Sequence, residues 1–379
     1  MSTLTLEPIT DKAGIRRFVT APDLVYEDDP TYVHPLVFER MEHLDAKKNP
    51  FLKGIEIAYW LAHRDGRPVG RISAQINARH LERYQDSTGQ FGFFECMDDP
   101  EAAAALLKVA EDWLRAKGMR RVKGPFNPTI NDEVGLLVKG LETPPMMMMG
   151  HGRAWYPKLV EGQGYQKVQD LLAYHFNVQA PWPAAAQRII DRSAKLETLH
   201  IRPLDMKRFD EEIRLVCDIF NDAWANNWGF IPFGEDEAAY LAKSIKMLVD
   251  ARHFAIGEID GVPAAMVVTI PNVNEAAFDL KGHLLPFGWA KLLWRLKVKG
   301  VKSSRMPLMG VRQAYQHTAK GAALALGVIG AVKDYHKGRG VEWAELSWIL
   351  ESNRAMNDLI VLVGGVPYKT YRIYEKALA

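Results

Sequence analysis

Two stretches of the chain alternate apolar and polar residues on both sides of an Asp-Gly pair. The first covers residues 60–77 around Asp65-Gly66, and the second covers residues 254–272 around Asp260-Gly261. Alternation with a period of two indicates strands, and Asp-Gly favours a tight turn between them. Each stretch therefore predicts a β-hairpin, one in each half of the chain.

Each predicted hairpin is followed by apolar residues at helical spacing and then by another strand. The first predicted helix covers residues 100–117 and the second covers residues 322–337, and a glycine follows each of them. The strand after each helix leads to an asparagine, Asn131 in one case and Asn353 in the other. The same elements therefore recur in the same order.

This recurrence predicts two copies of one α/β unit, the first over residues 1–180 and the second over residues 198–379. Residues 181–197 are the predicted linker, because Pro181 and Pro183 interrupt regular structure there. The competing interpretation is a chance likeness between turns and glycines that are common in α/β proteins.

Composition narrows the class of protein. The 379 residues carry a net charge of only +2, which does not favour a nucleic-acid partner. Cys96 and Cys217 are the only cysteines, too few for a disulfide framework. With no leader-like segment at the N-terminus and no long uncharged apolar run, we expect a cytoplasmic protein that does not cross a membrane.

The segment over residues 306–329 predicts a strand, a loop and a helix that opens on small residues near Gly321. Backbone N–H groups and the helix dipole at such a junction favour a phosphate or pyrophosphate group. Lys320 adds a full positive charge. The alternative is that the small residues serve only to pack the helix closely.

The order of elements in the second half resembles the GNAT acyltransferase superfamily. The pyrophosphate loop of that superfamily is matched by Gln316-x-x-Ala319-x-Gly321, and its later pattern by Asn353 and the segment Gly364–Tyr368. The resemblance implies two tandem GNAT-like units, each a mixed, mostly antiparallel sheet flanked by helices. It implies acyl-CoA as a co-substrate, no permanently bound cofactor, and the following contacts to it: Val311, Gln316, His317, Thr318, Ala319, Lys320, Gly321 and Ala322.

The first half resembles the same fold but departs from it at the corresponding loop. Asp98, Asp99 and Glu101 stand where a pyrophosphate group would bind, and like charges repel. We therefore expect a degenerate first copy that supports the second and holds part of the acceptor.

Acyl transfer to an amine needs a base for the amine and an acid for the leaving thiolate. Glu351, beside Asn353 at the end of a strand, is the first choice for the base, and Asp132 is the choice in the first copy. The tyrosine that many GNAT enzymes use as the acid is replaced here by Ile360. Either Tyr368, Tyr371 or Tyr374 substitutes for it or no residue does, and Tyr371 is the residue we name as catalytic.

Residues 281–305 carry seven basic residues and no acid, and they include a Leu- and Trp-rich stretch over Pro286–Gly300. An amphipathic helix here is typical of a helix that lies on an anionic membrane, and its predicted apolar face contains Leu285, Trp289, Leu292, Leu293 and Leu296. The alternative is a helix that covers the core with its lysine side chains at the surface. We expect peripheral attachment to the inner face of the membrane.

Four segments in order resemble the bacterial ceramide synthases, which are tandem GNAT-like N-acyltransferases. They begin at Gly124, Phe220, Ser347 and Tyr368. The resemblance implies a long-chain acyl-CoA donor and the amine of a sphingoid base, keto or reduced, as acceptor. The expected acceptor contacts are Asn127, Asn131, Glu133, Trp224, Asn227, Trp228 and Tyr156.

Two other functions remain open at this stage. One is an acetyltransferase of a small soluble amine, and the other is a non-catalytic module that binds a lipid surface. We expect no metal, because neither His151 nor His317 has the spacing of a metal ligand.

Overall fold

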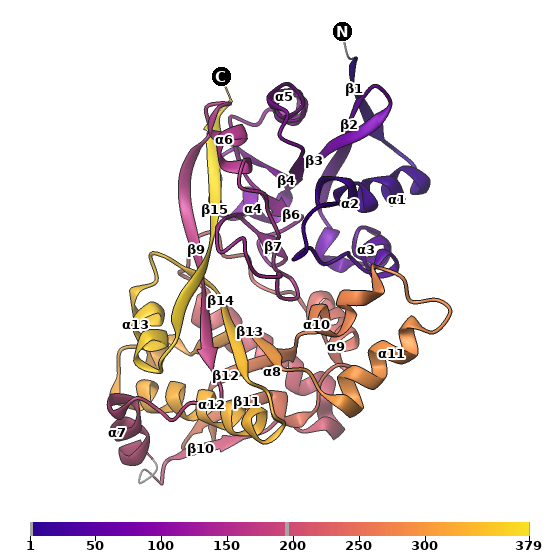
Figure 1. Ribbon diagram of the computed structural model, residues 1–379. Helices are drawn as coiled ribbons and strands as arrows, with labels where there is room; N and C mark the ends of the chain where they lie inside the picture. The colour runs from indigo at the N-terminus through magenta and orange to yellow at the C-terminus, as the bar shows by residue number, and fades with distance from the viewer. Residues whose placement is uncertain (1–2, 194–196, 379) are drawn as a thin grey trace. The chain divides into compact units, whose positions relative to one another are not determined.

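The computed structural model describes residues 3–193 and 197–378 and divides the chain into two compact units (Figure 1). Unit 1 consists of Met1–Leu171, Ala277–Gly288 and Lys369–Ala379. Unit 2 consists of Leu172–Ala276 and Trp289–Tyr368. Residues 194–196 of the predicted linker lie outside the described residues, and residues before them form a helix, α7, rather than an irregular segment.

The first part of the chain provides the strands and helices of unit 1. In chain order they are β1 (Leu4–Ile9), α1 (Lys12–Thr20), α2 (Pro22–Val25), α3 (Val37–His43), β2 (Ile55–Arg64), β3 (Arg67–Asn77), α4 (Ala78–Tyr84), β4 (Thr88–Cys96), α5 (Pro100–Ala116), β5 (Arg121–Gly124), β6 (Phe126–Asn127), β7 (Glu133–Val134), β8 (Leu136–Lys139), α6 (Tyr156–Glu161) and β9 (Gln166–Asn177).

The sheet of unit 1 is mostly antiparallel, in the order β1-β2-β3-β4-β5-β15. Strands β2 and β3 form the hairpin predicted around Asp65-Gly66. The one parallel pair in this order is β4 with β5, which the helix α5 connects. A parallel pair needs such a crossover, because a short turn cannot bring the chain back to the same end.

The later part of the chain provides unit 2. In chain order its elements are α7 (Ala184–Ser193), β10 (Leu199–Arg202), α8 (Phe209–Trp224), α9 (Glu235–Ile245), β11 (Phe254–Ile259), β12 (Val262–Pro271), α10 (Val273–Ala277), α11 (Gly288–Trp294), the π-helical turn η5 (Arg295–Lys299), β13 (Ser303–Val311), α12 (Ala319–Gly338), β14 (Trp343–Leu350), α13 (Arg354–Leu362) and β15 (Val366–Ala377).

The sheet of unit 2 repeats the arrangement of unit 1, in the order β10-β11-β12-β13-β14-β9. Strands β11 and β12 form the second predicted hairpin. Strands β13 and β14 are the parallel pair, and α12 connects them as α5 connects β4 and β5. The predicted α/β repeat is therefore present in the structure.

The predicted division of the chain at residues 180 and 198 does not hold for the last strand of each copy, because each of these strands pairs with the sheet of the other copy. The neighbour of β5 is β15, which ends the chain, and Tyr374–Ala377 pair with Arg121–Gly124. The neighbour of β14 is β9, which precedes the second copy. In Figure 1 the yellow end of β15 accordingly belongs with the indigo and purple strands of unit 1.

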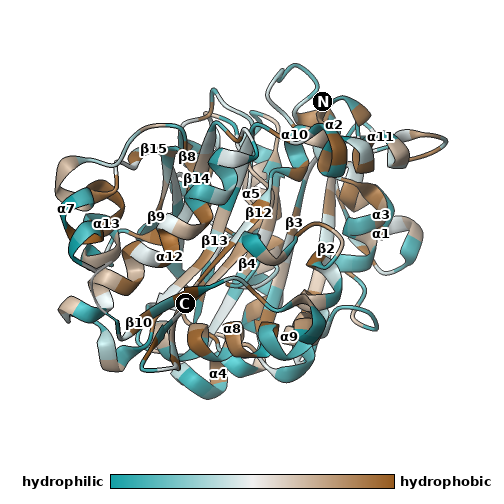
Figure 2. Ribbon diagram, turned by 90° about the horizontal axis from the view of Figure 1, so that it is seen from below, coloured by the Kyte–Doolittle hydropathy of each residue, from teal (hydrophilic) through white to brown (hydrophobic). Residues whose placement is uncertain are grey.

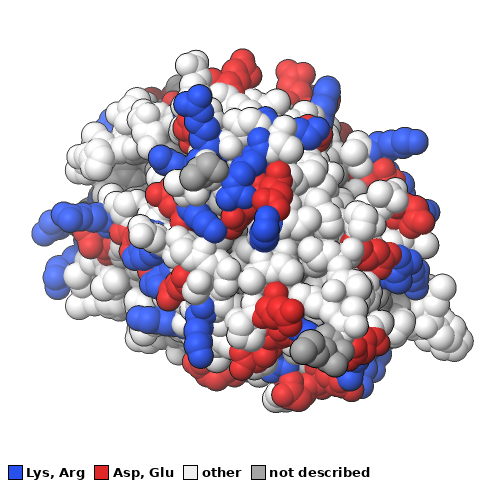
Figure 3. All heavy atoms as spheres, turned by 90° about the horizontal axis from the view of Figure 1, so that it is seen from above, with Lys and Arg blue, Asp and Glu red and all other residues white. Residues whose placement is uncertain are grey.

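Each unit has a core between its crossover helix and its sheet. Leu106, Leu107 and Leu114 of α5 are fully buried in unit 1, and Leu324 and Val328 of α12 are fully buried in unit 2. Several helices show both brown and teal segments in Figure 2, as helices with one apolar face do. On the face shown in Figure 3, basic and acidic side chains are interspersed.

The helix predicted over Pro286–Gly300 is shorter in the structure, and different side chains face the core. It begins at Gly288, and Leu285 lies before it with its side chain 82% exposed. Leu296 packs inward, whereas Trp289 is half exposed, so the predicted apolar face is divided. Arg295 is also turned inward, where its Nη1 donates to the carbonyl of Ala276 at 2.7 Å. The prediction of a single apolar face was therefore wrong.

Candidate functional site

The two parallel strands of unit 2 separate partway along their length. Strands β13 and β14 pair from Ser303–Trp343 to Met306–Leu346, and beyond these pairs the described residues form no further rung between them. Past the last rung the two strands no longer pair, although the carbonyls of Met309 and Val311 accept from the side chains of Trp224 and Gln316. An extended ligand can pair with a strand edge of this kind. We call this region, between residues 307–311 and 347–350, the unit 2 strand gap.

An aromatic side chain from α8 reaches the unit 2 strand gap. The indole Nε1 of Trp224 donates to the carbonyl of Met309 at 2.9 Å. Its ring meets Trp348 of β14 edge to face, with 5.8 Å between the ring centroids. Trp224, an expected acceptor contact, is thus fixed at the gap, and both rings give the gap an apolar lining.

A buried polar network lies at the root of the gap, just before the strands separate. Arg305 and Glu345 are paired across the ladder, and Ser347 follows on the same strand face. The Nε of Arg305 donates to Ser347 Oγ at 2.9 Å and lies 3.7 Å from Glu345 Oε1. The hydroxyl groups of Ser347 and Tyr368 both donate to the carboxylate of Glu345.

This network satisfies a charge that would otherwise be costly to bury. Glu345 is fully buried and Arg305 is 3% exposed. An isolated carboxylate in such a place would be strongly destabilising, so the guanidinium and the two hydroxyl groups are needed to hold it. Because Ala344 and Leu346 pack with the core of α12 and α13, Glu345 and Ser347 lie on the other face of the sheet.

The predicted anion loop follows β13 and opens α12. The Oγ1 of Thr318 caps the helix by accepting from the N–H of Gly321 at 3.0 Å. The side-chain amide of Gln316 donates to the carbonyls of Val311 and Ala223, which fixes the loop to β13 and α8. A Cβ at Gly321 would lie 2.0 Å from the carbonyl oxygen of Tyr315, so only glycine fits there.

The exposed part of this loop has the properties of an anion site. His317, Thr318, Ala319, Lys320 and Ala322 are exposed, and the first turn of α12 contains no acid. Within the described residues, the N–H groups of Ala319 and Lys320 have no hydrogen-bond acceptor. The ammonium group of Lys320 lies 3.9 Å from a carboxylate oxygen of Asp260, which is a long distance for an ion pair. The helix dipole and these N–H groups favour a phosphate group.

The acidic residues expected in the first copy form a separate cluster in unit 1. Asp132 accepts from the hydroxyl and N–H groups of Thr129 at 2.6 and 3.1 Å, and His43 Nε2 lies 3.4 Å from it. Burial raises the pKa of the Asp132 carboxyl group. A raised pKa is a property of a general base, which is the role expected of this residue.

Glu133 and Asn127 belong to the same cluster. Burial would raise the pKa of Glu133, but its ion pair with Arg40 outweighs burial, and the pKa is lowered. The Nδ2 of Asn127 lies 3.4 Å from Glu133, and Asn131 occupies the neighbouring turn, where its N–H donates to Thr129 Oγ1 at 3.1 Å. The structure therefore brings Asn127, Asn131, Asp132 and Glu133 together in one turn of unit 1.

Other predicted site residues lie elsewhere. Glu351 is exposed in the turn after β14, and the side chain of Asn353 accepts from Met356 N as the cap of α13. Tyr371 is fully buried, and so is Tyr156, whose hydroxyl donates to Glu95 at 2.5 Å. The buried tyrosines do not present a surface to a substrate. Two further expected acceptor contacts occupy the half-buried turn after α8: Asn227 and Trp228.

Tyr368 was predicted from the sequence as one of three possible acids, whereas Arg305, Glu345 and Ser347 were not predicted as site residues. The signal for two of them is visible, because Glu345 and Ser347 are polar residues two apart in an otherwise apolar strand. Their partner on the neighbouring strand depends on register, which the sequence does not specify.

The described residues contain no cluster of His, Cys, Asp or Glu that could hold a metal ion. Over residues 3–193 and 197–378, no helix combines the length and the apolar character that crossing a membrane requires.

Solved structures with this arrangement define the class of fold. A tandem GNAT protein of the clavulanic acid biosynthesis pathway superposes with a TM-score of 0.58 at 13% identity, over 100% of this chain and 99% of that one. A GCN5-related N-acetyltransferase from Sphaerobacter thermophilus gives a TM-score of 0.56 at 14% identity, over 99% and 96% of the two chains. The chain therefore has the tandem GNAT fold, and the predicted fold class is confirmed.

Curated relatives identify the family within that fold. The chain is 47% identical over 376 residues to the bacterial ceramide synthase of Caulobacter vibrioides, which covers 99% of this chain and 98% of the relative. It is 45% identical to the protein YghO of Escherichia coli K12, over 97% and 94% of the two chains. No family model matches the chain. The chain belongs to the bacterial ceramide synthase family and is an acyl-CoA-dependent N-acyltransferase.

Proposed function

We propose that this protein transfers a long-chain acyl group from acyl-CoA to the primary amine of a sphingoid base, in its 3-keto or its reduced form. The observation that carries the proposal is the unit 2 strand gap, which is open, lined by Trp224 and Trp348, and adjacent to the anion loop. The name of the Caulobacter relative supports the choice of acceptor.

The anion loop holds the pyrophosphate of CoA in this proposal. The open N–H groups of Ala319 and Lys320 point to the phosphates, and Lys320 adds charge. Val311, Gln316, His317, Thr318, Gly321 and Ala322 complete the site or shape it. The thioester arm then extends along the free edge of β13, and the acyl chain lies against the two indole rings.

The reaction joins the amine nitrogen to the thioester carbon and breaks the carbon–sulfur bond, so the amine loses a proton and the thiolate gains one. Tyr368 is the tyrosine that we assign to the thiolate. Ile360 is buried, and Tyr371 and Tyr374 are fully buried, whereas Tyr368 is half-buried and hydrogen-bonded to Glu345. Glu345 orients Tyr368 by accepting from its hydroxyl group, and the Arg305 guanidinium, 3.7 Å away, fixes Glu345 in turn.

The acceptor is proposed to use the residues that the sequence assigns to it. Asp132 and Glu351 remain the two choices for the base, and Asn127, Asn131 and Glu133 remain proposed contacts of the polar head. Asn227 and Trp228, beside Trp224, remain proposed contacts in unit 2. Tyr156 and Tyr371 would act only by supporting these residues, because both are fully buried. Asn353 positions the end of β14 by capping α13.

We also propose that residues 281–305 attach the protein to an anionic membrane surface, where both lipid substrates are available. Large apolar side chains in this segment are exposed: Leu285, Phe287, Trp289, Trp294 and Val298. Lys291, Lys297 and Lys299 stand among them. Exposed apolar residues interspersed with lysine are typical of a surface that binds anionic lipid.

The test is a turnover assay read by mass spectrometry. Palmitoyl-CoA and acetyl-CoA are each offered with sphinganine, 3-ketosphinganine and small soluble amines. We expect N-palmitoyl sphingoid base as the main product. Acetylation of small amines alone would favour the soluble acetyltransferase, and CoA binding without any turnover would favour the non-catalytic module.

A further inference from the structure

Unit 2 contains a second pocket, remote from the anion loop. It lies where β13 begins and α12 ends, whereas the anion loop lies where β13 ends and α12 begins. The 20 residues of α12 separate the two places by about 30 Å. The pocket has a cavity volume of about 50 Å³, which is room for several waters or one tetrahedral anionic group.

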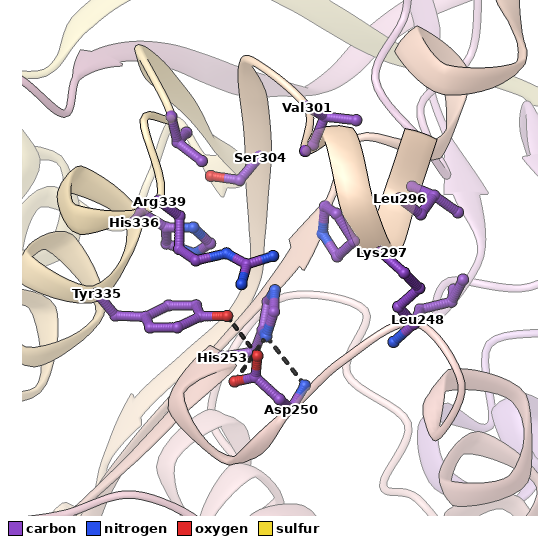
Figure 4. Close-up of a pocket in the computed structure, with 13 residues that line it drawn as sticks. Leu248, Asp250, His253, Leu296, Lys297, Val301, Ser304, Tyr335, His336 and Arg339 are labelled. Carbon is purple, nitrogen blue, oxygen red and sulfur yellow. Dashed lines mark hydrogen bonds and ion pairs between the residues drawn. The ribbon is translucent and has the colours of Figure 1, made fainter. Parts of the chain in front are cut away.

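Two polar side chains point into this pocket without a partner. The hydroxyl group of Ser304 is fully buried and, within the described residues, makes no hydrogen bond. Figure 4 shows the guanidinium of Arg339 reaching into the space above His253. Within the same residues it has neither an ion pair nor a hydrogen bond. A buried hydroxyl without a partner is costly, so Ser304 indicates a ligand that accepts hydrogen bonds. Arg339 is exposed and can supply a charged donor to the same ligand.

The acceptors that line the pocket are already engaged. The carboxylate of Asp250 accepts from the Tyr335 hydroxyl and from the N–H of Arg252, and His253 lies 3.3 Å from it. Figure 4 shows these groups on one side of the pocket. At the end of α12, the carbonyl of His336 accepts from the N–H groups of Arg339 and Val341.

The remaining charges make the pocket basic. Burial lowers the pKa of His336 to about 3, so this imidazole is neutral at physiological pH, and its Nε2 lies 2.8 Å from Thr269 Oγ1. Lys297 lines the pocket with an exposed ammonium group that has no partner in the part of the chain that the structure describes. Two cations, Arg339 and Lys297, thus face one carboxylate that is already hydrogen-bonded.

The pocket adjoins the exposed apolar residues of α11 and η5. Leu296 and Val301 anchor this segment in the core and also line the pocket. Trp294 and Val298, four residues apart and therefore on one side of the helix, are 53% and 72% exposed. Tryptophan prefers the boundary between the headgroups and the hydrocarbon of a membrane, so a basic pocket beside it lies at headgroup depth.

We infer that this pocket binds the phosphate of an anionic phospholipid headgroup, with Arg339 as a bidentate donor and Ser304 as a second donor. A guanidinium can donate two parallel hydrogen bonds to two oxygens of one phosphate group. The inference rests on the proposed membrane attachment and adds to it a specific headgroup contact.

The experiment measures binding of the full-length protein to vesicles of phosphatidylcholine alone and of phosphatidylcholine mixed with phosphatidylglycerol. Arg339→Gln and Ser304→Ala change the pocket, and Lys337→Gln is the matched control. Lys337 lies on the same helix, is exposed, and does not line the pocket. Circular dichroism checks that each variant is folded.

We expect Arg339→Gln to weaken binding to the mixed vesicles by about 10- to 100-fold, since it removes charged hydrogen bonds. Ser304→Ala changes no charge and is expected to weaken binding by about three- to tenfold. Lys337→Gln should cost no more than about fivefold, the effect of one surface charge. Equal losses for Arg339→Gln and Lys337→Gln, with Ser304→Ala unchanged, would overturn the inference.

Two further measurements are needed. One distinguishes a lipid phosphate from a free phosphate, and the other distinguishes failure of this inference from failure of the proposed function. Glycerol 3-phosphate is titrated into the same variants; if only its binding responds to them, the pocket takes a free anion and the lipid assignment is wrong. If the parent acylates a sphingoid base but binds no mixed vesicles, this inference fails while the proposed acylation stands. If vesicle binding depends on Ser304 and Arg339 but no acyl transfer occurs, the inference stands and the proposed function fails.

Discussion

The strand gap of unit 2 has a counterpart in unit 1, and the two differ in what fills them. In unit 1, β4 and β5 pair only from Thr88–Arg121 to Gln90–Lys123. The chain itself then occupies the space, because the Asn127 side chain accepts from Phe93 N at 2.5 Å. The backbone group that a bound thioester arm would use in unit 1 is therefore already satisfied by the protein.

The helix that follows differs in the same way. In unit 1, Asp99 caps α5 by accepting from Ala102 N at 3.0 Å, and Arg64 forms two hydrogen bonds to the same carboxylate at 2.7 and 2.9 Å. In unit 2, neutral Thr318 caps α12 and the next N–H groups are open. A carboxylate in unit 1 thus takes the place that an anionic ligand would take in unit 2.

The strand pairings of β13 with β14 and of β4 with β5 show which residues of the two gaps correspond. Gln90 and Lys123 of unit 1 stand at the positions of Arg305 and Glu345 in unit 2. Only the second pair includes a buried carboxylate. In unit 1 the Asn127 side chain holds the backbone N–H of Phe93, whereas the binding proposed for unit 2 uses a region in which β13 and β14 do not pair.

The largest expected effect is at the polar network. Glu345→Gln keeps the shape of the side chain but removes the charge that orients Tyr368, so turnover should fall by about 10²- to 10⁴-fold. Steady-state kinetics and acyl-CoA binding measure the two effects, and binding should be retained. The matched variant is Lys123→Gln, for which we expect a change below about threefold. Near-normal turnover of Glu345→Gln would show that protonation of the thiolate does not depend on the pair of Glu345 and Tyr368.

The next effect concerns how tightly unit 1 is filled. A Cβ at Gly92 would lie 1.8 Å from the carbonyl oxygen of Phe126, so Gly92→Ala must displace the chain that closes the gap. We expect a loss of about 2–4 kcal/mol in the free energy of unfolding, measured with urea. Pro307 is the corresponding residue of unit 2, and Pro307→Ala should cost less than about 1 kcal/mol. A similar loss in both variants would contradict the contrast between the gaps.

A smaller effect is expected at the anion loop. Lys320→Glu places a negative charge at the exposed helix start, and the Kd for CoA should rise about tenfold, as measured by calorimetry. Gly321 is unsuitable for this test, because any side chain there collides with Tyr315. The control reverses a charge at the start of α5, and Glu101→Lys should leave CoA affinity unchanged. If both variants bind CoA like the parent, the cofactor site lies elsewhere.

The smallest effect is a pH dependence in unit 1. Hydrogen bonds from Arg64 lower the pKa of Asp99 below its unfolded value of about 3.9. The folded carboxyl group then binds fewer protons than the unfolded one, so its stabilisation is present above that value and is lost as pH falls through the folded pKa. Asp99→Asn should therefore lower stability by about 1 kcal/mol at pH 7 and have no effect at low pH. Unfolding curves across the acid range measure this, and a parallel shift at every pH would argue against it.

Local patterns predicted the parts of this molecule that depend on neighbours in sequence. The two hairpins, α5 and the strand β14 follow from alternation, helical spacing and Asp-Gly turns, which act over a few residues. The anion loop was also placed correctly between a strand and a helix, although α12 begins at Ala319, before its apolar residues.

What the sequence did not reveal depends on contacts between distant residues. Arg295 is one of the seven basic residues of the segment 281–305, which were expected at the surface, but it donates a hydrogen bond to the carbonyl of Ala276. Glu345 and Arg305 are 40 positions apart, and only strand register shows that they pair. The exchange of β9 and β15 could not be inferred either, because both strands are compatible with either neighbour by pattern alone.

The place of β15 has a consequence for how the protein is made. Unit 1 includes Lys369–Ala379, so β5 has no outer neighbour until these residues have been synthesised. At about 5–20 residues per second, the roughly 200 residues after Leu171 take on the order of 10–40 seconds. During that time the first copy exposes an unpaired strand edge, which is a site of aggregation. Removal of Tyr374–Ala377 would therefore damage the unit that was translated first.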